Sequence, residues 1–170
     1  MLFSLLVVLV GVVMCFGLLC SQAPFTVQGS SNGLQLTMAL EKTEYSLGEP
    51  ISMTFTITNI SNQTMSLLHY GVGAFNMFEF RVYNDTDNSV WSQIYPVFAV
   101  NPGGPIVAST LLNPEESLTG VLVWEQTCNS TAFSEGVPVS SGTYHIVGQI
   151  GPIFMNGSTI ETTPVQVTIV

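Results

Sequence analysis

The sequence predicts an all-β protein, an antiparallel β-sandwich of seven to eight strands that follows one apolar helix. Residues 1–19 contain no charged side chain. After them, short runs of alternating apolar and polar residues are separated by turn-forming residues, which is the pattern of strands with one buried face. No stretch after Leu19 keeps apolar residues at helical spacing, so almost no helix is expected beyond the N-terminus. Short strands in this arrangement favour two packed sheets.

The N-terminal segment is long enough to cross a membrane as a helix. At about 1.5 Å per residue, residues 1–19 reach about 28 Å. No Lys or Arg precedes Lys42, and no good small-residue cleavage site follows the apolar run. The segment is therefore interpreted as a retained anchor, with a cleaved signal peptide as the alternative. Gly17-Leu18-Leu19-Cys20 also faintly resembles a lipoprotein box, which leaves lipidation open.

Three regions are expected along the chain. Residues 1–20 form the anchor or signal segment, residues 21–32 a linker rich in Gln, Ser, Gly and Asn, and residues 33–170 the sandwich. The clearest strand alternates Ile51, Met53, Phe55 and Ile57 with Ser and Thr. The strands are expected at Leu34–Leu40, Ile51–Thr58, Ser66–Tyr70, Met77–Tyr83, Val90–Tyr95, Ser117–Glu125, Thr143–Ile150 and Thr163–Val170.

The expected strand Met77–Tyr83 has side chains that alternate between an inner and an outer face. Phe78, Phe80 and Val82 should point inward, and Glu79, Arg81 and Tyr83 outward. The hexapeptide that follows, from Asn84 to Ser89, is rich in turn formers. A Pro/Gly loop follows later, with Pro102, Gly103, Gly104 and Pro105 at its centre.

Composition excludes some classes of partner. Charged residues make up 8% of the chain, with two basic against eleven acidic residues and a net charge of −9. A chain so poor in Lys and Arg cannot neutralise a row of phosphates, so nucleic-acid binding is not expected. Docking on anionic lipid through a basic patch is disfavoured for the same reason. Contact with the membrane is expected through residues 1–19 alone.

Five Asn-x-Ser/Thr sequons fall at expected turns or strand ends, where a glycan could be accommodated. The alternative is that Asn, Ser and Thr are simply common in β-turns. The sequons are Asn59, Asn62, Asn84, Asn129 and Asn156.

No disulfide framework is indicated, because Cys15 and Cys20 lie in or beside the apolar segment and leave Cys128 alone in the domain. Cys128 is interpreted as a small buried residue, or otherwise as a thiol that can pair between chains.

The sequence shows no recognisable set of catalytic or metal-ligating residues. His69 and His145 have no Glu or Cys at ligand spacing. The segment from Asp85 begins like a calcium loop but has Val90 at the sixth position and Pro96 at the twelfth. No nucleophile elbow or phosphate-binding glycine loop occurs. We therefore expect no enzyme activity, no metal and no cofactor.

A series of expected core and turn residues occurs in an order along the chain that resembles the pattern of a known family. The residues are Tyr45-x-x-Gly48-Glu49-x-Ile51, Thr58-Asn59, Phe78-Glu79-Phe80-Arg81-Val82, Val90-Trp91, Phe98, Leu112-x-Pro114-x-Glu116, Trp124 and Gly142-x-Tyr144. They are similar to the BsuPI-like intracellular proteinase inhibitor family over roughly Leu34 to Ile150.

The resemblance implies an immunoglobulin-like sandwich, here in an exported, membrane-targeted form. Three features depart from the family: the turn reads Pro114-Glu115-Glu116 instead of Pro-Gly-Glu, a loop from Ala99 to Ser109 looks inserted, and a terminal strand is added.

Three functional interpretations stay open. The first is a non-catalytic interaction domain that binds another protein, anchored on the extracellular side of the membrane, or secreted if the leader is cleaved, and glycosylated. The second is a proteinase inhibitor, in which the loop Pro96–Asn113 inserts into a protease because Pro102 and Pro105 restrict it. The third is a subunit of a filament or coat, in which Phe25 and Val27, or the C-terminal strand, add to a neighbour's sheet edge.

Overall fold

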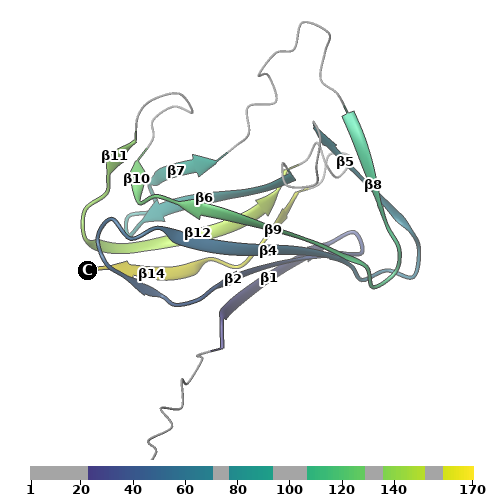
Figure 1. Cartoon of the computed structure of the whole chain (residues 1–170), viewed down its shortest axis with the longest axis horizontal. Coiled ribbons are helices and arrows are strands. Elements are labelled where there is room, and N and C mark those ends of the chain that lie inside the picture. Colours follow the sequence, from purple (N-terminus) through teal and green to yellow (C-terminus); the bar gives the residue numbers. More distant parts are fainter. Residues whose placement is uncertain (1–22, 71–76, 94–106, 129–135, 152–158) are drawn as a thin grey trace, which may run out of the picture.

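The computed structural model describes residues 23–70, 77–93, 107–128, 136–151 and 159–170, and within these ranges every regular element is a strand except for a single 3-10 residue at Met77 (Figure 1). The expected N-terminal helix lies outside the described residues. The strands are β1 (Phe25–Ser31), β2 (Leu34–Leu40), β3 (Glu44–Tyr45), β4 (Ile51–Asn59), β5 (Met65–Tyr70), β6 (Phe78–Asn84), β7 (Ser89–Gln93), β8 (Val107–Leu112), β9 (Ser117–Trp124), β10 (Thr127–Cys128), β11 (Val137–Pro138), β12 (Gly142–Ile150), β13 (Ile160–Glu161) and β14 (Val165–Ile169).

Two main sheets form the body of the molecule. One is antiparallel with the order β1-β2-β4-β9, and the other has the order β3-β14-β12-β6-β7 with β13 beside β12. In the second sheet the β3–β14 pair is parallel and the other pairs are antiparallel. The short pairs β5–β8 and β10–β11 lie at opposite ends of the body (Figure 1). The predicted all-β sandwich is thus confirmed at the level of fold class, and the parallel β3–β14 pair is an exception to the expected antiparallel pairing.

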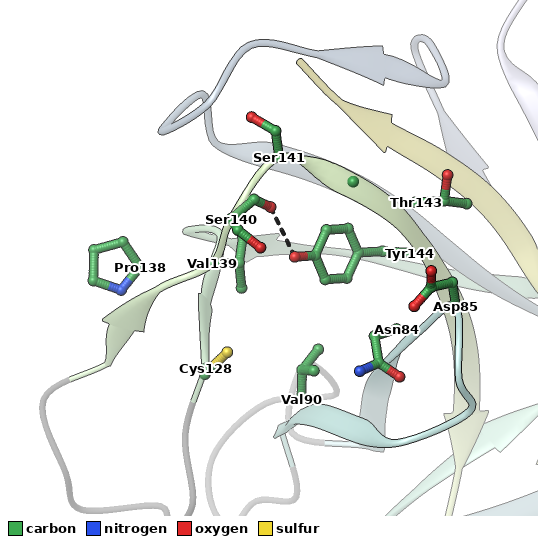
Figure 2. Close-up of a pocket in the computed structure, with 11 residues that line it drawn as sticks. Asn84, Asp85, Val90, Cys128, Pro138, Val139, Ser140, Ser141, Thr143 and Tyr144 are labelled. Carbon is green, nitrogen blue, oxygen red and sulfur yellow. Dashed lines mark hydrogen bonds between the residues drawn. The ribbon is translucent and has the colours of Figure 1, made fainter.

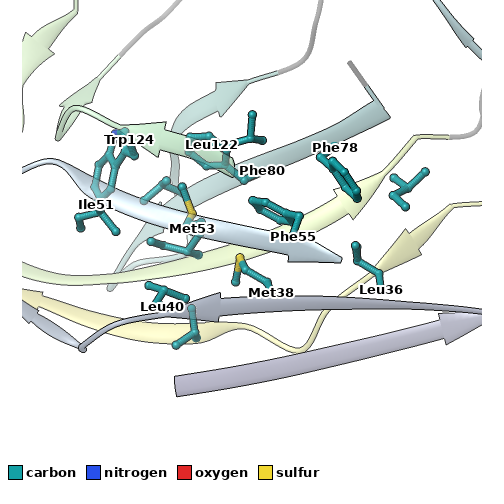
Figure 3. Close-up of a cluster of buried hydrophobic side chains, with 14 of the residues drawn as sticks. Leu36, Met38, Leu40, Ile51, Met53, Phe55, Phe78, Phe80, Leu122 and Trp124 are labelled. Carbon is teal, nitrogen blue, oxygen red and sulfur yellow. The ribbon is translucent and has the colours of Figure 1, made fainter. Parts of the chain in front are cut away.

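The core lies between the two sheets and comes from the alternation seen in the sequence (Figure 3). In β4, Met53, Phe55 and Ile57 are fully buried while the Ser and Thr residues between them face outward. Across the core, the rings of Phe55 and Phe78 stack at 5.7 Å between centroids. Burying each such large apolar side chain contributes about 1.5–3 kcal/mol. This alternation therefore holds the two layers together.

Gly148 makes the close approach of the sheets possible. A Cβ atom at this position of β12 would lie 2.5 Å from Cε1 of Phe55 and 3.2 Å from the sulfur of Met38. Such a separation is far below van der Waals contact, so the Phe55 ring occupies the space that a side chain would need.

The region expected to be a linker, residues 21–32, contains strand β1, so that prediction is wrong. Phe25 pairs with Leu40 and Ser31 with Leu34 at the edge of the four-stranded sheet. Gly29 allows this, because a Cβ there would lie 1.7 Å from the carbonyl oxygen of Glu161. Polar residues on an edge strand resemble a linker in composition, since only one face is half-buried.

The number of strands also differs from the expected seven to eight. Ten of the strands have five or more residues, and β1 and β8 are the additional ones. Strand β8 begins at Val107, inside the segment expected to be an inserted loop. Its run of Val, Ala, Ser, Thr and Leu pairs with β5 and not with the main sheets.

Glu79 is buried although its position in β6 points away from the core. Its exposed fraction is 6%, and Gln149 Nε2 donates a hydrogen bond of 2.7 Å to Glu79 Oε2. Glu79 faces outward as expected, but its side chain is buried there against Gln149. The register explains the contact, since β6 and β12 place Glu79 directly opposite Gln149 on the outer face of the sheet.

Candidate functional site

An open cleft of about 530 Å³ lies at one end of the sandwich (Figure 2). The β6–β7 turn forms one wall, β10 and β11 form another, and the corner that leads into β12 closes it. Loops gather at the ends of sandwich domains, where they are free to vary without disturbing the core. The lining residues are Asn84, Asp85, Val90, Cys128, Pro138, Val139, Ser140, Ser141, Gly142, Thr143 and Tyr144.

The β6–β7 turn is held by the side chain of Asn84. Its Oδ1 accepts hydrogen bonds from the amide and hydroxyl of Thr86, at 3.2 and 2.9 Å, and from the amide of Asn88 at 2.9 Å. Asp87 takes a positive φ of 58° within this turn. Asn is well suited to this place because its side chain can replace a backbone acceptor. Oδ1 therefore serves the turn as an acceptor, and Nδ2 is the atom of this side chain that can donate to a ligand or carry the proposed glycan.

Tyr144 forms the floor of the cleft. Its hydroxyl donates a 2.8 Å hydrogen bond to the carbonyl of Ser140, four residues earlier, which fixes the corner before β12 (Figure 2). Its ring meets Trp124 edge-on at 5.6 Å between centroids. Trp124 in turn donates from Nε1 to the carbonyl of Thr127 at 3.0 Å. The floor is therefore rigid, while Ser140 and Ser141 are exposed at the rim.

Among the described residues that line the cleft, the exposed Asp85 is the one charged residue, and none is a cation. The two basic residues of the chain lie in other contacts, Lys42 with Glu49 at 2.6 Å and Arg81 with Glu161 at 3.9 Å. Hydroxyl groups, amides and a single carboxylate can bind a neutral polar ligand or a cation. They cannot balance the charge of a phosphate or a carboxylate ligand.

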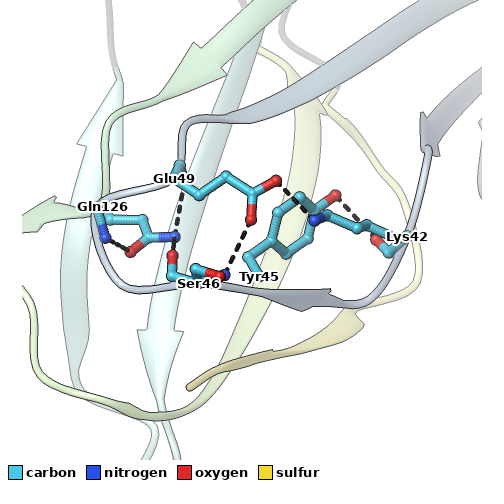
Figure 4. Close-up of polar contacts among 6 residues, drawn as sticks. Lys42, Tyr45, Ser46, Glu49 and Gln126 are labelled. Atoms are coloured by element: carbon cyan, nitrogen blue, oxygen red, sulfur yellow. Dashed lines mark hydrogen bonds and ion pairs between the residues drawn. The ribbon is translucent and has the colours of Figure 1, made fainter.

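Lys42 and Glu49 belong to a polar cluster at the β3–β4 turn (Figure 4). Hydrogen bonds from Lys42 and from the amide of Ser46 lower the pKa of Glu49. Burial raises the pKa of Tyr45 above 10.0, and its hydroxyl donates to the carbonyl of Lys42 at 2.9 Å. Gln126 is buried beneath the turn and donates to the carbonyls of Ser46 and Glu49, at 2.9 and 2.7 Å. These contacts stabilise the turn and leave no group free for chemistry.

Of the predicted glycosylation sites, Asn59 is buried in the folded domain. Its exposed fraction is 0%, and Nδ2, the atom that would carry a sugar, donates to the carbonyls of Gln63 and Leu112 at 2.7 and 2.9 Å. Its Oδ1 accepts from the amide and hydroxyl of Ser61. A glycan would replace one of the two Nδ2 hydrogens, so at least one of these bonds would be lost, and the buried side chain leaves no space for a sugar.

The remaining predicted site residues divide into two groups. Asn62 is exposed after β4, and Asn84 is half-buried at the cleft. Asn129, Asn156 and the loop residues Pro102, Gly103, Gly104 and Pro105 lie outside the described residues. Of the predicted site residues that the structure describes, only Asn84 lines the cleft.

Histidine and cysteine do not form a site in the described part of the chain. His145 is half-buried on β12, and no three His, Cys, Asp or Glu side chains of the described residues come together as metal ligands. Cys128 is half-buried and packs against the core, as well as lining the cleft. Among the described residues, no helix is long and apolar enough to span a membrane.

Sequence reasoning missed most of the cleft. Ser140, Ser141 and Thr143 carry no motif, and their approach to the β6–β7 turn depends on the pairing of β6 with β12. One signal was present: Gly142-x-Tyr144 was among the residues of the family resemblance.

No family model matches this chain, and no curated protein does. Solved structures are similar at low identity. The β-glucosidase from Listeria innocua in complex with isofagomine is 13% identical with a TM-score of 0.46, over 83% of this chain and 16% of that chain. A β-glucosidase from Erythrobacter marinus is 12% identical with a TM-score of 0.42, over 85% and 16%. The CARDB domain of PF1109 from Pyrococcus furiosus, in complex with di-metal ions, is 11% identical with a TM-score of 0.38, over 82% and 97%. The chain thus spans about a sixth of the β-glucosidases.

Proposed function

We propose that the chain is a non-catalytic, extracytoplasmic interaction domain that binds a partner protein in the cleft at the end of the sandwich. The observation that carries the proposal is a cleft of about 530 Å³ in which Asp85 is the one charged residue among the described lining residues. Such a lining favours a partner segment that donates hydrogen bonds and carries a positive charge, such as a Lys side chain on a polar peptide.

The domain is proposed to be an immunoglobulin-like sandwich. The orders β2-β4-β9 and β6-β12-β14 correspond to the A-B-E and C-F-G strands of that fold. The hydrogen bond from Tyr144 to Ser140 corresponds to the tyrosine corner before strand F. The resemblance to the BsuPI-like family agrees with this topology and stays a prediction.

Residues 1–19 are proposed to hold the domain at the extracellular side of the membrane, with glycans at Asn62 and Asn84. The proteinase inhibitor stays an alternative, because its loop, Pro96–Asn113, lies largely outside the described residues. The filament subunit also stays an alternative, although both strands named as donors pair within the chain's own sheets, Phe25 with Leu40 and Val165 with Ile146.

The binding proposal can be tested with two pentapeptides that differ only in the charge of the central residue, Gly-Gly-Lys-Gly-Gly and Gly-Gly-Glu-Gly-Gly, both with blocked termini. The full chain in detergent micelles is titrated with each peptide, and the amide NMR resonances of residues 84–85 and 140–144 are followed. We expect the Lys peptide alone to shift these resonances. Added salt should weaken its binding, because the attraction is between exposed charges.

A matched pair of variants locates the effect. Asp85→Asn should abolish the preference for the Lys peptide, whereas Asp87→Asn should retain it, since Asp87 lies in the same turn but does not line the cleft. The proposal fails if both peptides bind equally or if neither shifts the cleft resonances. Slowing of a protease by the intact chain, without cleavage, would support the inhibitor alternative.

A further inference from the structure

The outer edges of the two main sheets differ in how they are protected from pairing with another chain. Strand β3 is only two residues long, and β7 pairs with β6 through a shift in register between Val82 and Tyr83. Strand β1 is contacted by residues that follow β13, since the amide of Thr163 donates to the carbonyl of Gln28 at 3.1 Å. Short strands, bulges and covered edges are the devices by which natural sheets avoid edge-to-edge association.

Strand β9 has none of these devices. It is eight residues long, ends the four-stranded sheet, and pairs with β4 in an unbroken register from Ser117 to Trp124. It contains no Pro and no charged residue. Val121 and Val123 are 56% and 42% exposed on its outer face. Among the described residues, no strand pairs with its other side.

We propose that β9 is the site at which two copies of this chain associate, with their β9 strands antiparallel about a two-fold axis at Val121. The result is a continuous sheet of eight strands, four from each copy. On the core side, Gly120 falls opposite Leu122 of the second copy, so a position without a side chain faces a large one. On the outer side, Val121 meets its own counterpart and Thr119 meets Val123.

Charge favours a second copy at this edge. The chain carries a net charge of −9, so two copies repel one another over most of their surface. The outer face of the four-stranded sheet is an exception, because none of its side chains is charged. This face consists of Thr26, Gln28, Ser30, Gln35, Thr37, Ala39, Ser52, Thr54, Thr56, Thr58, Ser117, Thr119, Val121 and Val123.

The acidic residues that flank β9 do not oppose one another in this arrangement. With the axis at Val121, Glu125 falls opposite Ser117 of the second copy and Glu116 opposite Gln126. No like-charge pair forms across the new edge, and the exposed valines gain cross-strand neighbours.

Cross-linking of the full chain in detergent micelles tests the position of the axis. In a background of Cys15→Ser, Cys20→Ser and Cys128→Ser, the variant Val121→Cys is treated with a short bifunctional thiol reagent. Directly opposite Cβ atoms lie about 4.5–5.5 Å apart in antiparallel strands, so the two new thiols should be linked rapidly. Thr54→Cys is the matched control, because Thr54 is exposed and pairs with Val121 one strand further in.

We expect covalent dimer to form from Val121→Cys at a rate about tenfold higher than from Thr54→Cys, since the control thiols are separated by two further strand spacings. Equal rates, or faster linking through Thr54→Cys, would show that the sheets associate by their faces and would overturn the proposal.

Sedimentation of the full chain provides an independent measurement. Val121→Lys places two lysines opposite each other at the axis and should raise the dimer dissociation constant about tenfold or more, which corresponds to about 1.4 kcal/mol. Thr54→Lys should leave the dimer unchanged, and both variants should retain the circular dichroism of the parent. A dimer that persists in Val121→Lys would be held by other residues, the leader included, and would contradict the proposal. So would a parent chain with one copy per micelle at every concentration.

Discussion

At Asn59 one buried side chain connects three segments of the chain. It lies at the end of β4, donates to the carbonyl of Gln63 and to that of Leu112 in β8, and accepts from Ser61. The same residue types at the same spacing define a glycosylation sequon. Local sequence cannot separate the two roles, because the carbonyl of Leu112 comes from a distant strand.

We expect Asn59→Ala to lower the free energy of unfolding by about 2 kcal/mol or more, because the substitution leaves buried carbonyls without donors. Asn62→Ala, three residues away and exposed, should change the free energy of unfolding by no more than about 0.5 kcal/mol. Denaturant titration of both variants measures the difference. Equal effects would mean that the Asn59 bonds contribute nothing to stability.

Glu79 makes the stability of the domain depend on pH, which its outward position in the strand does not suggest. Burial raises the pKa of its carboxyl above 4.5, and the hydrogen bond from Gln149 and the charge of Arg81 only partly oppose this. The folded state therefore binds the proton more tightly than the unfolded state. The free energy of unfolding should fall as the pH rises from about 4.5 through the raised pKa of the folded state.

Glu79→Gln should remove this part of the pH dependence. The variant should be more stable than the parent at pH 7 and similar to it at pH 4, since Gln still accepts the hydrogen bond from Gln149 without a buried charge. Glu161→Gln is the control, because that side chain is exposed on the same face and its ion pair with Arg81 is long. Denaturant titration at pH 7 and at pH 4 measures the free energy of unfolding of each variant. A Glu79→Gln variant that is less stable than the parent at pH 7 would show that the ionised carboxylate stabilises the fold.

Among the elements, the sequence could predict those whose burial has a period of two. Strands β2, β4, β6, β9, β12 and β14 were expected close to their observed bounds, because an inner face and an outer face differ clearly in polarity. Strand β1 was missed because an edge strand with one half-buried face has a linker-like composition. The position of the cleft was missed because it depends on which strands become neighbours, and periodicity does not encode strand order.

Gly148→Ala tests the packing between the layers. The new Cβ would clash with Phe55, and we expect a loss of about 1–3 kcal/mol in the free energy of unfolding, the usual cost of overpacking. Phe55→Leu should relieve the clash, so the double variant should lose less than the sum of the two single losses in a double-mutant cycle. Strictly additive losses would show that the Cβ is accommodated by movement elsewhere.

For the whole molecule, the low content of charged residues leaves solubility to hydroxyl groups, amides and, in our proposal, glycans. The described sequons available to a glycan, Asn62 and Asn84, lie in turns at opposite ends of the sandwich (Figure 1). A glycan at Asn84 would lie at the mouth of the cleft, because that residue lines it.

We therefore expect mass spectrometry of the chain, produced in a host that glycosylates Asn, to find sugar on Asn62 and none on Asn59. Asn62→Gln should remove that glycan, and Ser61→Ala, which destroys only the Asn59 sequon, should leave the glycan mass unchanged. The same spectra report the mature N-terminus and so decide between a retained anchor and a cleaved leader. Sugar on Asn59 of folded protein would contradict the buried side-chain amide with its two donated hydrogen bonds. An unmodified Asn62 would remove the Asn62 glycan from the proposed function.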